Sequence, residues 1–122
     1  MTIGKFLAVV IDCANPLGMS SFWQQLLGGK IDPNTSSQEW MSLSGVPGLG
    51  YLGFQKVPES KSIKNRVHID VDVETIDDAV QRAIALGAEK SGEIVEEETN
   101  YFQVMLDPEK NEFCFILRKG NT

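Results

Sequence analysis

The sequence predicts an α+β domain built from two β-α-β-β-β halves, and three observations support this prediction. Two stretches carry apolar residues at helical spacing, and each ends at a glycine. Strand-like segments surround both stretches, and several of them alternate apolar and polar side chains. The order of these elements repeats after about half of the 122 residues, which is the pattern expected of a duplicated unit.

The first half opens with an apolar segment, Phe6 to Asp12, for which we predict a central strand buried on both faces. The pair Asn15-Pro16 supplies a cap and an early proline for a helix, whose apolar stripe is Met19, Phe22, Trp23, Leu26 and Leu27. Two further strands are predicted at Glu39 to Leu43 and Leu49 to Val57, on either side of a turn rich in glycine and proline.

The second half repeats this order. A strand is predicted from Arg66 to Val73, and Thr75 is placed to cap a helix that ends at Gly87. A hairpin and a last strand complete this half, at Glu89 to Glu97, Tyr101 to Asp107 and Glu112 to Arg118.

The two halves superpose with a shift of 59 positions. This shift places Phe54 on Phe113, Gln55 on Cys114 and Val9 on His68. We therefore expect residues 1–122 to form a single domain of two modules, at about 1–60 and about 64–122.

The strand predicted from Arg66 to Val73 separates two kinds of side chain. Its valines and isoleucine face one side and should meet a helix, whereas the other side carries Arg66, His68, Asp70 and Asp72. Such a row can bind a polar ligand group or move protons. The alternative is a structural role, in which His68 is hydrogen-bonded to a neighbour such as Asp70 and has no chemical duty.

Composition narrows the classes of partner. The net charge of −6 argues against nucleic acid and anionic membranes, since both demand a clustered basic surface. No apolar run approaches the roughly 20 residues that cross a bilayer. Cys13 and Cys114 form no CxxC pair and are expected to be reduced thiols. We therefore expect a cytoplasmic protein whose partners are small molecules and other protein chains.

Three segments, FWQQLLGG, VHIDVDVETIDDAVQRAIALGA and VMLDPEKNEFCFI, together resemble the vicinal oxygen chelate superfamily. This group contains glyoxalase I, bleomycin-resistance proteins and extradiol dioxygenases, and the chain is most similar to its small glyoxalase-like members. The resemblance implies paired βαβββ modules whose sheets curl around a cavity, with the helices outside. The resemblance is less specific for a reaction than for the fold, because proteins with this fold catalyse many different reactions.

The resemblance also raises the question of a metal. Metal-dependent members place one ligand on the first and last strand of each module, which here implies Ala8 or Val9, Gln55, His68 and Cys114. Only His68 is the expected residue type, so we expect no metal and no other cofactor. If a divalent ion did bind, its ligands would be His68 with Gln55 and Cys114.

Two further residues have alternative interpretations. Cys114 is either a nucleophile paired with His68 or a small residue that fills a strand. Trp40 is the aromatic residue best placed to stack on a flat ligand, whereas Phe22 and Trp23 belong to the expected core. The ligand-binding set is therefore predicted to be Arg66, His68, Asp70, Gln55, Cys114 and Trp40, with His68 as the catalytic candidate.

Three functional hypotheses follow. The first is a metal-independent small-molecule-binding protein of the glyoxalase and bleomycin-resistance type, with the ligand held around His68. The second is an enzyme, a lyase or isomerase, that uses His68 as a metal ligand or general base. The third is a homodimer whose cavity has no ligand, in which exposed edge strands pair across a two-fold axis.

Overall fold

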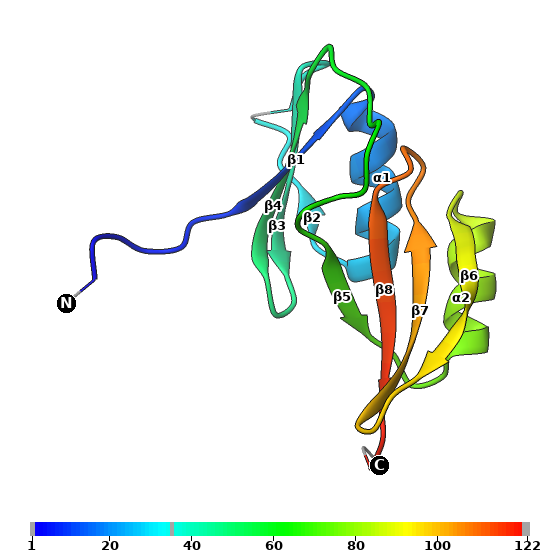
Figure 1. Ribbon diagram of the computed structural model, residues 1–122. Coiled ribbons are helices and arrows are strands. Elements are labelled where there is room, and N and C mark those ends of the chain that lie inside the picture. Colours follow the sequence, from blue (N-terminus) through cyan, green and yellow to red (C-terminus); the bar gives the residue numbers. More distant parts are fainter. Residues whose placement is uncertain (1, 35, 121–122) are drawn as a thin grey trace. The chain divides into compact units, whose positions relative to one another are not determined.

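The computed structural model describes residues 2–34 and 36–120, which divide into two compact units between Ser60 and Lys61 (Figure 1). Each unit is a four-stranded mixed sheet with one helix, so the α+β class and the two repeated modules are confirmed. A common cavity, and the grouping of both units into a single domain, stay predictions. Among the described residues, no helix has the length and apolar character needed to cross a membrane.

The first unit contains one helix, α1 (Pro16–Leu27), and the strands β1 (Val9–Cys13), β2 (Lys30–Ile31), β3 (Trp40–Val46) and β4 (Gly50–Lys56). The strands lie in the order β1-β4-β3-β2, and only the β1–β4 pair is parallel. The predicted cap is confirmed, because the Asn15 side chain accepts a hydrogen bond from the Gly18 N–H at 3.2 Å. Phe22 and Trp23 are buried, as expected, and pack edge to face.

The second unit contains α2 (Ile76–Ala85) and the strands β5 (Ile69–Asp72), β6 (Glu89–Glu96), β7 (Asn100–Leu106) and β8 (Glu112–Arg118). Its order, β5-β8-β7-β6 with β5 parallel to β8, repeats that of the first unit. The helix buries Ile76, Val80 and Ala83 against the sheet. Thr75 occupies the cap position as predicted, but its side chain makes no capping hydrogen bond.

The prediction for the first strand was wrong in two respects. β1 begins at Val9 rather than Phe6, and it lies at the edge of its sheet rather than at the centre. The residues before it form an extended segment, in which the Phe6 and Leu7 side chains are 75% and 86% exposed (Figure 1). An apolar run in the sequence does not distinguish a central strand from an edge strand, because burial on both faces depends on which strands become neighbours.

The strand predicted from Arg66 is also shorter than expected. β5 begins at Ile69, where its pairing with Phe113 of β8 begins. Val67 lies before this point and is 78% exposed, so it does not pack against the second helix as predicted. The chain ahead of β5 is held differently, by a hydrogen bond from the Asn65 N–H to the Glu112 carboxylate at 2.9 Å.

The internal repeat is present, but its shift is 60 to 62 positions rather than 59. The helices begin at Pro16 and Ile76, which are 60 positions apart. A turn hydrogen bond from Leu49 to Val46 recurs from Lys110 to Asp107, which is 61 positions later. Local matching of the Leu-Gly pairs gave the smaller number because Leu27 is the last residue of α1, whereas Leu86 is the residue after α2, one position nearer to the start of its helix.

This shift changes which residues correspond. Val9 pairs with Leu52 in the first unit, and Ile69 pairs with Phe113 in the second. Counting from these pairs, Ala8 corresponds to His68, and Gly53 rather than Gln55 corresponds to Cys114. The buried residues agree with this alignment, because Leu52 and Phe113, and likewise Phe54 and Phe115, are buried at positions 61 apart. Leu43 and Met105, the partners of Leu52 and Phe113, are also buried and are 62 positions apart.

Candidate functional site

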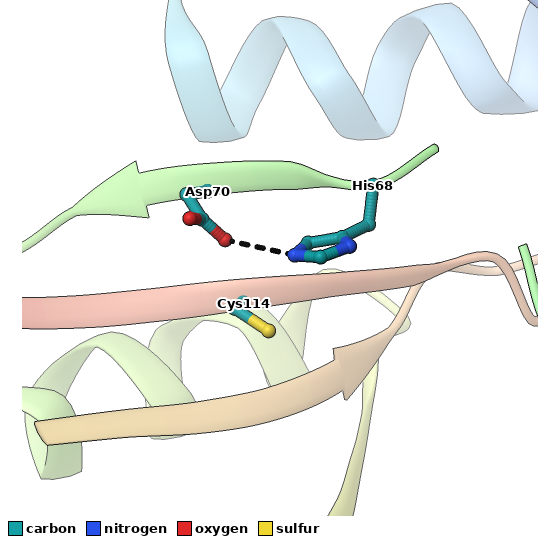
Figure 2. A group of neighbouring side chains, drawn as sticks. All are labelled: His68, Asp70 and Cys114. Carbon is teal, nitrogen blue, oxygen red and sulfur yellow. Dashed lines mark ion pairs between the residues drawn. The ribbon is translucent and has the colours of Figure 1, made fainter. Parts of the chain in front are cut away.

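The pairing of β5 with β8 creates the centre of the candidate site. Asp70 lies opposite Cys114 in the parallel register. Phe113 and Phe115 are buried on the side of the sheet that α2 covers, so Cys114, which lies between them, faces the other side. Figure 2 shows the Asp70 and Cys114 side chains on this face, together with His68.

His68 lies one residue before β5, and its ring is turned back toward the strand (Figure 2). The Nε2 atom is 3.3 Å from Oδ1 of Asp70, which is the contact described in the structural alternative for His68. Their side chains are 44% and 58% exposed. A carboxylate beside Nε2 favours a proton on that nitrogen, which leaves Nδ1 of the neutral ring as a hydrogen-bond acceptor.

Cys114 is the buried member of this cluster. Burial, followed by the negative charge of Asp70, raises the pKa of the Cys114 thiol, and the nearby Lys64 ammonium opposes this only in part. The thiol is therefore protonated at neutral pH. A catalytic cysteine needs the opposite shift, so the environment favours the structural interpretation of Cys114 over the nucleophilic one.

The three side chains carry donors of the types that bind transition metals. The nearest ligand atoms of His68, Asp70 and Cys114 all lie within 4.8 Å of one another. Three protein ligands suffice for an open zinc site, but zinc distances of about 2.0–2.3 Å place donors about 3.3–3.8 Å apart. Metal binding would therefore require the side chains to close in and the thiol to lose its proton.

The other predicted site residues are placed differently. Arg66 is exposed and lies ahead of β5. Gln55 and Trp40 belong to the first unit, where they are opposite each other in the β3–β4 pair. In that unit the indole ring of Trp40 lies over Gly53, so that a Cβ atom there would be 2.8 Å from Cζ2. Their roles in ligand binding stay predictions.

Sequence reasoning missed two ion pairs that flank the cluster. Arg118 donates to both carboxylate oxygens of Asp72, at 3.2 and 3.0 Å. At the other end of β8, the Lys61 ammonium is 3.1 Å from Oε1 of Glu112. Burial raises the pKa of Glu112, but the Asn65 N–H and Lys61 outweigh it, and the pKa is lowered. The alternation of β8 could have identified Glu112 and Arg118, since both share the face of Cys114.

Comparison with known proteins identifies the family of this chain. Residues 8–116 match the model of the glyoxalase-like domain. The chain belongs to this family. A comparison with curated protein sequences gave no match.

Solved structures of other proteins have folds similar to that of this glyoxalase-like chain. An enzyme of the glyoxalase/bleomycin resistance protein/dioxygenase family from Burkholderia phytofirmans PsJN is 28% identical, with 90% of this chain and 95% of that chain covered and a TM-score of 0.70. The fosfomycin resistance protein FosX from Listeria monocytogenes is 14% identical, with 95% and 94% covered and a TM-score of 0.73. A hypothetical protein from S. aureus, SA1046, is 16% identical, with 95% of each chain covered and a TM-score of 0.74.

The register gives this glyoxalase-like chain an asymmetric set of donors. In the second unit, the position just before β5 carries His68, and the middle of β8 carries Cys114. The corresponding positions of the first unit carry Ala8 and Gly53, and neither side chain has a donor atom. Potential ligand atoms are thus concentrated in the second unit.

Proposed function

We propose that this chain is a metal-independent small-molecule-binding protein that holds its ligand on the sheet face around His68. One observation carries the proposal. The half-exposed His68–Asp70 pair stands beside Cys114 on the face opposite α2, whereas the corresponding positions of the first unit have no donors. A partly exposed polar cluster on a sheet face is available to a ligand, because its groups are not all satisfied internally.

The cluster would recognise a ligand with a polar group. Asp70 accepts hydrogen bonds, and His68 offers an acceptor at Nδ1 when neutral or a second donor when protonated. The Cys114 thiol contributes a small, weakly polar floor beneath the ring (Figure 2). Arg66, just ahead of β5, belongs to the proposed ligand-binding set, whereas the roles of Gln55 and Trp40 in the first unit stay predictions. No cofactor is part of the proposal.

A thermal denaturation screen with a chelator present tests this function. The compounds would be aromatic drug-like molecules together with bleomycin and fosfomycin, which appear in the names of similar proteins. We expect a compound that raises the melting temperature without metal, and we expect the shift to be lost in His68→Gln. Arg82→Gln, an exposed change on α2, is the control and should keep the shift. Stabilisation only by nickel, zinc or manganese would count against the proposal.

The second candidate is an enzyme of the lyase or isomerase kind. The observation in its favour is the donor set of His68, Asp70 and Cys114, together with a carboxylate that orients the imidazole. A divalent ion bound there would polarise a substrate oxygen, and without one His68 would act as general base. Turnover of a hemithioacetal or another small carbonyl compound, lost in His68→Ala, would support this candidate. No turnover with any added metal would rule out its metal-dependent form.

A homodimer in the cytoplasm is also part of the proposal. The exposed apolar side chains of Ile3, Phe6 and Leu7 precede the edge strand β1, and exposed apolar clusters favour association. Sedimentation equilibrium should give a dimer for the native chain and a monomer for Phe6→Asp. A native monomer would contradict this. Cys13 and Cys114 are buried and form no disulfide, which is compatible with a reducing compartment. No nucleic-acid or membrane partner is proposed.

A further inference from the structure

The second unit has a recess on the side of its sheet opposite the His68 cluster. Its volume is about 290 Å³, and its lining residues are Thr75, Ile76, Asp77, Ile94, Tyr101 and Leu117. The recess exists because α2 buries only Ile76, Val80 and Ala83 against the sheet. At the N-terminal end of the helix, the cross-strand pair Tyr101 and Leu117 is left partly exposed.

A bulge in β6 supplies the outer wall. The register of β6 against β7 shifts between Ser91 and Val95, and Gly92 has a φ of 74° within this bulge. The buried Gln103 amide fixes it by donating to the Gly92 and Ser91 carbonyls at 3.0 and 3.2 Å. Ile94 therefore turns its side chain into the recess, where it is 48% exposed. The wall is held in place before any ligand arrives.

The chemistry of the recess favours one class of ligand. Its floor and walls are aliphatic and aromatic, so they suit a compact hydrocarbon group. The charged group in its lining is the Asp77 carboxylate. Two other charged residues near the recess are already in ion pairs. Asp78 lies 3.7 Å from Arg82. Lys119 lies over the Tyr101 ring and is 2.7 Å from Glu96.

We propose that this recess is a second binding site, which takes a protonated amine attached to a compact hydrophobic group. The hydrocarbon part lies between Ile76, Ile94 and Leu117, and the ammonium group lies at the rim beside Asp77. This site is separate from the His68 cluster, since it lies on the helix side of the sheet.

Titration of the ¹⁵N-labelled chain with three probes of one shape tests the proposal. The probes are 4-tert-butylbenzylamine, 4-tert-butylbenzyl alcohol and 4-tert-butylbenzoate. We expect amide shifts around Thr75, Ile94 and Leu117, with the amine binding about fivefold more tightly than the alcohol, as one exposed ion pair allows. The benzoate should bind most weakly, because Asp77 repels it.

Two variants on one strand provide a matched comparison. Ile94→Ser removes a wall of the recess and should weaken binding of the amine about tenfold. Val95→Ser is the control, because Val95 has a similar exposure of 41% but pairs with Phe102 on the opposite face of the sheet. This variant should bind the amine as tightly as the native chain does. Asp77→Asn should make amine and alcohol bind equally. Shifts elsewhere in the chain, equal binding by both serine variants, or tighter binding of the benzoate would overturn the proposal.

Discussion

The two modules have the same framework but different chemistry. Their helices and strands correspond in order, and the core positions of β4 and β8 are filled by large apolar residues in both. On the opposite sheet face, the first module has Ala8, Val10 and Gly53 where the second has His68, Asp70 and Cys114. Core residues are constrained by packing in each module, whereas the exposed face is free to differ. A repeat of fold is therefore not a repeat of function.

The largest expected effect tests how each module fills its core. Trp23 and Ala83 occupy the same helix position, 60 residues apart, and both are buried. Trp23→Ala should lower the free energy of unfolding by about 3–5 kcal/mol, because the small side chain leaves a cavity. Ala83→Gly should cost only about 1 kcal/mol through helix propensity. Urea unfolding followed by circular dichroism measures both, and similar costs would break the comparison.

The next effect tests whether the Trp40 ring is the reason for glycine at position 53, where the second module has Cys114. Gly53→Ala should lower the free energy of unfolding by about 1–3 kcal/mol, because the new methyl group meets the Trp40 ring. The same change in a Trp40→Ser background should cost much less, since the obstacle is gone. A double-mutant cycle in urea measures this coupling. Additive costs would show that the ring is not what requires glycine there.

The third prediction concerns the pH dependence that Cys114 gives to the second module. Burial and Asp70 raise the pKa of the Cys114 thiol in the folded chain, so the unfolded chain loses this proton at lower pH. The contribution of Cys114 to stability should therefore fall as the pH rises above about 8.5, the ordinary thiol pKa. The urea midpoint of Cys114→Ala should decline less than that of the native chain between about pH 8 and pH 10. Parallel declines would contradict the raised pKa.

The smallest effect concerns the polar pair itself. Asp70→Asn should change the free energy of unfolding by less than about 1 kcal/mol, because both partners are largely exposed to water. Binding of a ligand found in the screen should fall strongly in the same variant, if the second module alone carries the site. Calorimetry of binding beside urea unfolding separates the two quantities. A large loss of stability without loss of binding would assign Asp70 a structural role.

Local sequence signals predicted much of the framework. The Asn15 cap, both helices and the last strand, Glu112–Arg118, were predicted from short segments, and the structure has them. The alternation around His68 also allowed its contact with Asp70, because side chains two apart in an extended segment share a face. Such features depend on residues close in sequence, so a pattern is sufficient to find them.

Features that depend on distant partners were predicted less well. The starts of β1 and β5 were placed too early, since a strand begins where its neighbour offers hydrogen bonds, at Leu52 and Phe113. The repeat shift was also misjudged, and with it the residue that corresponds to Cys114. A register error of one or two positions is invisible in a list of elements, but it reassigns every residue on a sheet face.

The sequence by itself determined the α+β class, the duplicated order of elements and the single histidine at the centre of a polar row. Tertiary structure alone decided that Cys114 lies opposite Asp70, that Gly53 is its counterpart beneath Trp40, and that a recess opens beside α2. The physical reason is that periodicity assigns a side chain to a face of its own element. The neighbours on that face are fixed only when strands 40 or more residues apart pair in one register.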